Sequence, residues 1–462
     1  MKKALAVLLV LIMIPMLFYG CQSSPKQEPS GDVTSSQSSA PDASSAAVKS
    51  DFDPLKYSGQ EVVFSCLDTT IYKKFDSLLP KLEKDTGIKL TIDYIPENAY
   101  ITKMQVVNSS QTGEYDASYA NAKMYPGWFA SGWVQPLDDY LNDPTKTFPD
   151  FKYDDFIPGL TQDLKYNDKI MAIPWESESN ILYYNKNMFA EAGLTTPPKT
   201  MEEVAEYAKK LHNPAAGHAG IAMLGTRESG VNGFTWIMQW FALGGNWKPE
   251  GKEPYTVLAD EPAINATKLW TNLLTNYAPE GIANYGWNEL YLSMQQEKVA
   301  MIIATTSDYP ELADPSKSKV ADHLGCACIK GMGDKYTIGN ISTWIMSSAG
   351  KNKDATWVAM QYMTSEASQK SMVTEQDFVG VTRQSVMDSD EFAKQFDPEW
   401  AAAAKEAYQH AIMEYSPAIP QGPQIREYLG IALSKCLSGQ ATPEAAMKEA
   451  NDNVVKLLAK NK

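Results

Sequence analysis

Trp175 and Glu176 stand next to each other directly after Pro174, at the end of a short apolar run. A tryptophan ring offers a flat apolar face, and a carboxylate offers strong hydrogen-bond acceptors. Side chains of these two kinds at a strand break are suited to hold a polar, ring-shaped ligand. We therefore predict that Trp175 stacks on a ligand and that Glu176 binds its hydroxyl groups. Packing of Trp175 in the core at a chain crossover is the alternative interpretation.

Three further polar side chains follow the ends of predicted strands: Asp68, Asn121 and Asp308. Ligands of open α/β sheets bind beyond the carboxyl ends of the strands, so these positions predict ligand contacts. Trp236 and Trp287 are candidate stacking residues. Trp236 lies in an apolar helical segment, which favours a place in the core for it.

The composition argues against nucleic acid and is rich in aromatic rings. The 462 residues are enough for two or three domains, and they carry a formal net charge of −15. The phosphates of nucleic acid need a basic surface, so we expect no nucleic-acid partner. The 24 tyrosines and 11 tryptophans provide many rings that can lie against the C–H faces of a sugar.

The motifs of common catalytic and metal sites are missing from the sequence. It has no GxSxG, no HExxH and no phosphate-loop pattern, and its four histidines lack metal-ligand spacing. The acidic run 138–155 lacks the ligand spacing of an EF-hand. We expect no metal, no cofactor and no enzymatic activity. A secreted carbohydrate-active enzyme remains an alternative, because the separation of two catalytic carboxylates is a three-dimensional property.

Strands and helices alternate along the chain, which predicts the α/β class. Residues 61–66 and 88–95 read as strands on either side of a helix, and this spacing predicts a parallel βαβ unit. Pro80 must kink or split that helix. Further strands are expected at 115–119, 220–224, 299–304, 326–329 and 344–347. Cys66, Cys326, Cys328 and Cys436 are predicted to be small buried side chains rather than disulfide or metal partners.

The stretch 169–200 holds two predicted strands, 170–173 and 181–184, with a break at Pro174 between them. Asn187 is expected to cap a short helix that Gly193 ends. Thr200 and Glu203 form a predicted capping box for the next helix.

The first 20 residues read as a signal peptide: a basic start, an apolar run and Gly20 before Cys21. Cys21 resembles the lipidated cysteine of a bacterial lipobox, although Phe18 stands where that motif usually has leucine. An ordinary secretory leader with an incidental cysteine is the alternative. Residues 22–50 contain ten serines and almost nothing apolar, which predicts a flexible tether.

Several segments together resemble the extracellular solute-binding proteins of ABC transporters, in the sugar-binding branch that includes maltose-binding protein. The most specific is ILYYNKNMFAEAGLTTPPKTMEEVAEYAKKL, with the Tyr-Asn-Lys, Ala-Gly-Leu and Pro-Pro-Lys-Thr run of the family. The resemblance covers nearly everything from residue 60 to 462. The other segments that carry it are FDSLLPKLEKDTGIKL, SGWVQPLDDYL, LYLSMQQEKVAMII, AMQYMTSEASQKSM and LSGQATPEAAMKEA.

The resemblance implies a two-lobed periplasmic-binding-protein-like fold with a ligand cleft between the lobes. It places residues 59–175 and 344–386 in the first lobe and 176–343 and 387–462 in the second, after a signal peptide (1–20) and a tether (21–58). It also suggests ligand contacts for Asp308, for Trp344 near a crossover, and for Arg383, which alternatively locks its loop. Core packing is the alternative for Trp344.

The function that the resemblance implies is the lipid-anchored, substrate-binding subunit of an ABC importer for a sugar, either an oligosaccharide or a polyol. Its partners would be the sugar, the permease subunits and, through Cys21, the extracellular face of the cytoplasmic membrane. We expect a monomer. The same fold binding a non-sugar solute is the third possibility, beside the importer subunit and the enzyme.

Overall fold

The computed structural model describes residues 52–122, 124–227, 230–417 and 419–460, all within one compact unit. The predicted signal peptide, Cys21 and most of the predicted tether lie outside the described residues. Within the described part, no helix combines the length and the apolar character that a membrane span requires.

The first strands form the predicted parallel unit. Strand β1 (Glu61–Leu67) pairs in parallel with β2 (Lys89–Ile95) and with β3 (Ala117–Ala120). The connection from β1 to β2 is split as Pro80 predicted. A first turn α1 (Thr70–Lys73) and a 3₁₀ segment (Lys74–Leu78) precede α2 (Leu79–Thr86), and the proline lies in the first turn of α2, where its missing N–H costs nothing.

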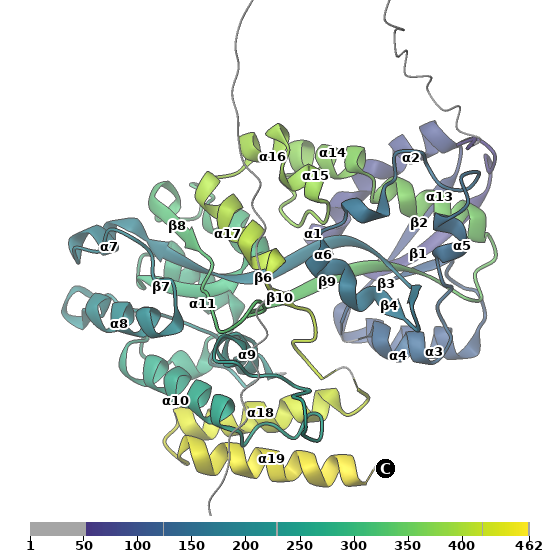
Figure 1. The fold of residues 1–462 in the computed structure, drawn as a ribbon. Helices are drawn as coiled ribbons and strands as arrows, with labels where there is room; N and C mark the ends of the chain where they lie inside the picture. Colours follow the sequence, from purple (N-terminus) through teal and green to yellow (C-terminus); the bar gives the residue numbers. More distant parts are fainter. Residues whose placement is uncertain (1–51, 123, 228–229, 418, 461–462) are drawn as a thin grey trace, which may run out of the picture. The chain divides into compact units, whose positions relative to one another are not determined.

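Two long antiparallel strands, β6 (Ile173–Asn185) and β9 (Thr337–Met346), run through the middle of this unit (Figure 1). The sheet order is β2-β1-β3-β9-β6-β7. Strand β6 pairs along its second half with β7 (Met301–Thr305) and β8 (Leu324–Ala327). Strand β9 pairs with β3 on its other side, so the β6–β9 pair joins the β1–β3 end of the sheet to its β7–β8 end.

Three strand predictions need correction. The second of the two strands expected within 169–200 belongs to β6, which begins at Ile173 and contains Pro174, because a register shift between Pro174 and Glu176 absorbs the proline without ending the pairing. The first, expected at 170–173, shares only Ile170 with the short strand β5 (Lys169–Ile170) and Ile173 with β6. The short strand expected at 344–347 is the end of the longer β9. The segment 220–224 forms no strand and makes one isolated bridge, from Ala222 to Ile302.

Helices cover the sheet at both ends (Figure 1). Near β1–β3 and the following loops lie α3 (Glu97–Ser110), α4 (Tyr125–Ala130), α5 (Asp138–Leu141), α6 (Pro158–Thr161), α13 (Lys353–Met363), α14 (Glu366–Gln376), α15 (Gln384–Met387) and α16 (Asp390–Gln395). The remaining elements are β4 (Lys165–Tyr166), β5 (Lys169–Ile170), α7 (Lys186–Glu191), α8 (Met201–Leu211), α9 (Asn232–Ala242), α10 (Glu261–Asn276), α11 (Trp287–Gln295), α12 (Tyr309–Leu312), α17 (Pro398–Gln409), β10 (Ala411–Ile412), α18 (Gly422–Leu437) and α19 (Pro443–Ala459).

Side chains fix the starts of α7 and α8. Asn185, not the predicted Asn187, caps α7 and accepts hydrogen bonds from the amides of Asn187 and Met188. Thr200 caps α8 as predicted, and its Oγ1 accepts from the amide of Glu203. The four cysteines at 66, 326, 328 and 436 are free and buried, as the sequence predicted.

Replacing Thr200 with alanine should lower the free energy of unfolding by about 1 kcal/mol, because the Glu203 amide loses its side-chain acceptor. Thr200→Ser keeps the hydroxyl group and is the matched control. Urea unfolding of both variants measures the effect. Equal stability of the alanine variant and the unaltered protein would contradict a stabilising cap.

Candidate functional site

A cleft of about 570 Å³ opens where β1, β3, β6, β7 and β9 come together. Residues from the β1–β3 side form one wall: Leu67, Thr69, Tyr72, Tyr119 and Asn121. The opposite wall consists of Glu178, Val231, Phe234, Trp287, Tyr291, Thr305, Ser307, Asp308, Asn340, Tyr415 and Arg426.

Two carboxylates stand in the second wall, and neutral groups orient both of them. Glu178 accepts hydrogen bonds from Asn340 Nδ2 and from Ser307 Oγ, each at 2.9 Å. Asp308 accepts from the Tyr291 hydroxyl at 2.7 Å and from the amide and hydroxyl groups of Thr305 at 2.7 and 2.8 Å. A carboxylate has about four acceptor sites, so both groups keep acceptor capacity toward the cleft.

Aromatic rings form the apolar part of the same wall. The ring of Phe234 packs edge-on against Trp287 with 5.3 Å between centroids, and against Tyr415 with 5.7 Å. Tyr291 follows Trp287 one turn later on α11, with 6.1 Å between their ring centroids. Because these rings hold one another in place, the wall combines a rigid apolar face with the fixed acceptors of Glu178 and Asp308.

The first wall ends in hydroxyl and amide groups. Asn121 donates from Nδ2 to the Tyr119 hydroxyl at 2.9 Å. Tyr72 Oη lies 2.9 Å from Ser342 Oγ at the bottom of the cleft. The two walls thus place uncharged hydrogen-bonding groups opposite carboxylates.

Burial raises the pKa of two carboxyl groups at the site. Desolvation first, and then the nearby Glu178, raise the pKa of Glu176 to about 8, whereas the hydrogen bond from Ser342 opposes this shift. Desolvation likewise raises the pKa of Asp308 to about 7, against the hydrogen bonds from Tyr291 and Thr305.

The raised pKa of Glu176 makes stability depend on pH. Between pH values of about 5 and 8, the folded state keeps a proton that the unfolded chain has lost, so this group's contribution to stability falls as pH rises. Glu176→Gln removes that dependence. In urea unfolding, the free energy of unfolding of the variant minus that of the unaltered protein should increase by about 1 kcal/mol from pH 6 to pH 7. The exposed Glu202→Gln is the control, and a constant difference would contradict the prediction.

Three of the predicted site residues line the cleft: Asn121, Trp287 and Asp308. Glu176 lies behind it, 2% exposed, and reaches it only through Ser342. Asp68 does not line the cleft. It is exposed and forms an ion pair with Lys73, while its neighbours Leu67 and Thr69 do line the cleft.

The structure places the other three predicted tryptophans in the core. Trp175 and Trp344 stack on each other with 5.1 Å between centroids, and both are almost fully buried. Trp175 also meets the rings of Tyr72 and Phe75 edge-on. Trp236 is buried in α9 and donates from Nε1 to Thr267. These buried positions match packing in the core, which was the alternative interpretation for each of the three tryptophans.

Arg383 is buried away from the cleft and holds a loop together. Its guanidinium donates to the carbonyl oxygen of Thr364, to that of Lys152 and to the carboxylate of Asp155. It also lies over the ring of Phe156, 4.1 Å from the centroid. This position matches the loop-locking alternative.

Sequence reasoning missed several cleft residues, chiefly Tyr72, Tyr119, Glu178, Phe234, Tyr291 and Asn340. One signal was available for Glu178: it comes two residues after Glu176 on a strand, and residues at that spacing share a face. The others come from helices and strands far apart in the sequence, so no local pattern relates them.

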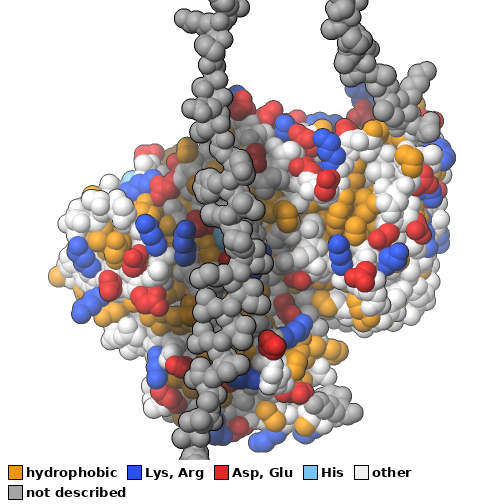
Figure 2. Space-filling view, in the orientation of Figure 1, with side chains coloured by type: hydrophobic (Ala, Val, Ile, Leu, Met, Phe, Trp, Pro, Cys, Tyr) orange, Lys and Arg blue, Asp and Glu red, His pale blue; other side chains and the backbone are white. Residues whose placement is uncertain are grey.

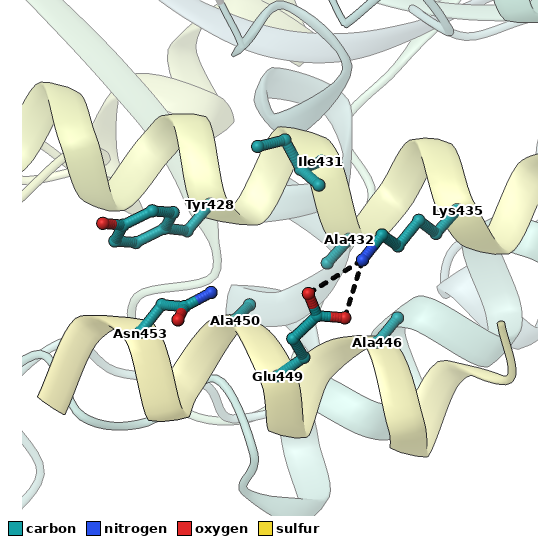
Figure 3. Close-up of a pocket in the computed structure, with 8 residues that line it drawn as sticks. All are labelled: Tyr428, Ile431, Ala432, Lys435, Ala446, Glu449, Ala450 and Asn453. Atoms are coloured by element: carbon teal, nitrogen blue, oxygen red, sulfur yellow. Dashed lines mark hydrogen bonds and ion pairs between the residues drawn. The ribbon is translucent and has the colours of Figure 1, made fainter. Parts of the chain in front are cut away.

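A second cavity, of about 100 Å³, lies between α18 and α19 (Figure 3). Lys435 and Glu449 bridge it with two contacts of 2.8 and 2.7 Å. It is about one-sixth the size of the cleft, and an ion pair closes it, so we do not regard it as a ligand site.

Acidic and basic side chains are interspersed on the visible face of the protein (Figure 2). The described residues contain no group of three or more potential metal ligands.

Comparison with known proteins gives a consistent result. The family model of the bacterial extracellular solute-binding proteins matches residues 68–370. The erythritol/L-threitol-binding protein of Mycolicibacterium smegmatis is 24% identical over 366 residues, 76% of each chain. The mannitol-binding protein of Pseudomonas aeruginosa is 24% identical over 298 residues, 64% of this chain and 66% of that protein. A solute-binding protein of Agrobacterium radiobacter K84, crystallised with ribitol, has a TM-score of 0.73 at 24% identity and covers 88% of this chain and 100% of its own. The likeness confirms the predicted two-lobed α/β fold.

Proposed function

Because the chain belongs to the bacterial extracellular solute-binding proteins, as its motifs predicted, we propose that it is the substrate-binding subunit of an ABC importer for a polyol or sugar. One observation carries this proposal: oriented carboxylates and a rigid aromatic face share one wall of the cleft. Carboxylates accept from hydroxyl groups, and aromatic faces pack on C–H groups. A compound with many hydroxyl groups satisfies both.

The ligands named for similar proteins support a polyol. Erythritol or L-threitol and mannitol are in the names of two similar proteins, and ribitol is bound in the crystal structure of the third. All are uncharged and carry a hydroxyl group on every carbon. Such a ligand can donate to Glu178 and Asp308 and, with its remaining lone pairs, accept from Asn121 and the phenols of the facing wall.

Binding would be coupled to closure of the lobes. The two walls of the cleft come from opposite ends of the sheet, and β6 and β9 connect these ends. A ligand that contacts both walls binds the closed form better than the open form, and it shifts the population by that difference in affinity. We propose the boundaries 59–175 with 344–386 and 176–343 with 387–462 for the two lobes. The closed form then docks on the permease, while a lipid on Cys21 keeps the protein at the extracellular face of the membrane.

A sugar panel tests the proposal. We expect calorimetry with erythritol, ribitol, D-mannitol, D-tagatose and maltose to show saturable binding of at least one compound, and small-angle scattering to show compaction on binding. No binding across the panel and no compaction would refute it. Binding of a charged solute alone would favour the third class of function. Turnover of a chromogenic glycoside, lost on Glu178→Gln, would favour the enzyme.

Trp287→Ala should weaken binding of the best ligand by about 10- to 100-fold, because a ligand loses an apolar face worth roughly 1.5–3 kcal/mol when buried. Tyr166→Ala is the matched control, since Tyr166 is an exposed ring on β4 outside the cleft. Calorimetry on both variants gives the comparison. Equal losses in the two variants would show that Trp287 does not contact the ligand.

A further inference from the structure

A chain of hydrogen-bonding groups connects the buried carboxyl group of Glu176 with the cleft. Ser342 lies opposite Glu176 on β9, and its Oγ is 2.6 Å from Glu176 Oε2. The same Oγ is 2.9 Å from Tyr72 Oη, and either of these two atoms can be the donor. Tyr72 lines the cleft, and its ring centroid lies 5.5 Å from that of Tyr119, the second phenol of that wall.

A proton on Glu176 Oε2, the oxygen that faces Ser342, sets the direction of donation along this chain, because each hydroxyl group has only one proton. Glu176 protonated on Oε2 donates to Ser342, Ser342 donates to Tyr72, and the proton of the Tyr72 phenol is left for the cleft side. An ionised Glu176 accepts from Ser342, so Tyr72 donates to Ser342. The phenol oxygen of Tyr72 is then an acceptor toward the cleft side.

We propose that Glu176 is a positioning residue whose protonation state decides whether the phenol wall of the cleft donates hydrogen bonds to the ligand or accepts them. The inference rests on the proposed function, because it describes how that cleft distinguishes donors from acceptors. Ligand binding is thereby coupled to the proton on a residue that does not touch the ligand.

The opposite wall sets the sign of the coupling. Glu178 and Asp308 are acceptors, so a ligand hydroxyl group that donates to them turns its lone pairs toward Tyr72 and Tyr119. Those lone pairs need a donor. The bound state therefore favours the protonated form of Glu176.

The surroundings of Glu176 agree with a proton held there near neutral pH. The titratable groups that act on it or feel its charge are Glu178 on β6, Tyr72 on α1, Tyr119 on β3, Tyr408 on α17 and Cys66 on β1. None of these groups is a cation. In the segment before Arg383, Gly380 packs on Glu176: a Cβ there would lie 2.8 Å from Glu176 Cγ. Desolvation raises the pKa of Glu176 to about 8, so the proposed change falls in an accessible pH range.

Tyrosine ¹³Cζ NMR on the ligand-free protein tests the chain of hydrogen bonds directly. Tyr72→Phe assigns the Tyr72 signal. We expect that signal to shift with a midpoint near pH 8, and to lose this step in Glu176→Gln and in Ser342→Ala. A Tyr72 signal that is constant from pH 6.5 to 9.5, or one that still shifts in Glu176→Gln, would overturn the proposal. This measurement needs no ligand.

Ribitol binding at different pH values tests the coupling. We expect the affinity of the unaltered protein to fall about tenfold from pH 7 to pH 9, since binding then requires proton uptake. Glu176→Gln keeps a neutral donor next to Ser342, so it should bind with less than a twofold change over that range. A merely structural Glu176 would instead give weaker binding with an unchanged pH profile, which would contradict the proposal.

The variant Asp308→Asn separates the contribution of Asp308 to the pH dependence of ribitol binding from that of Glu176. Ionisation of Asp308 improves an acceptor, so its effect on affinity has the opposite sign, and its removal should leave the loss above pH 8 in place. If ribitol and the rest of the sugar panel do not bind, the proposed function fails, while the NMR titration still decides whether Glu176 controls Tyr72.

Discussion

Replacing Glu178 with glutamine should weaken binding of the best polyol by about 10- to 100-fold. Glu178 presents acceptors to the cleft, and a hydrogen bond to a charged group contributes roughly 1.5–3 kcal/mol. Glutamine has the same shape, but its NH₂ group must face either Asn340 Nδ2 or Ser307 Oγ, both of which now donate to the carboxylate. The variant therefore loses an acceptor for the ligand and disturbs the groups that orient it.

Calorimetry with the ligand found in the sugar panel measures this loss. Glu202→Gln, in the exposed first turn of α8, is the matched control and should bind like the unaltered protein. Unfolding curves of the two variants separate a local effect from a loss of stability. Unchanged affinity of Glu178→Gln would show that the ligand lies elsewhere.

Replacing Trp175 with alanine should lower the free energy of unfolding by about 3–5 kcal/mol, because it leaves a cavity at the centre of an aromatic cluster. The Trp175 ring stacks on Trp344 and meets Tyr72 and Phe75 edge-on, so three neighbours lose contacts at once. Urea unfolding measures the loss. Trp175→Phe refills much of the space and should recover more than half of it.

Ligand binding by Trp175→Phe distinguishes the core position from the stacking role that the sequence predicted. We expect its affinity to stay within about threefold of that of the unaltered protein, in contrast to Trp287→Ala. A large loss of affinity with unchanged stability would restore Trp175 as a ligand contact. The comparison is informative because both residues are tryptophans, but only Trp287 lines the cleft.

Arg383 shows how a motif can indicate importance without indicating a role. The sequence marked it as a ligand contact or a loop lock, and its contacts with Thr364, Lys152 and Asp155 are those of a loop lock. A buried guanidinium that satisfies two carbonyl oxygens and a carboxylate is expensive to remove. The motif around Arg383 is therefore explained by the contacts with which Arg383 holds its loop together.

The sequence by itself determined the local elements, the fold class and the family. Periodicity placed the βαβ unit around β1 and β2, Pro80 predicted the split before α2, and Thr200 with Glu203 marked the start of α8. Each of these features depends on residues close together in the chain. Asn121 and Asp308 also emerged from the sequence, because the ends of strands have local signatures, and Trp287 was named as a candidate stacking residue.

Only the tertiary structure decided which side chains meet in the cleft. Trp175 and Trp287 are chemically identical candidates, but the first packs against Trp344 across the β6–β9 pair, and the second lines the cleft. Glu176 and Glu178 share one face of β6, and only their surroundings differ: Gly380 packs on Glu176, whereas Glu178 lines the cleft. The reason is physical: exposure depends on long-range packing, which no local pattern of residues encodes.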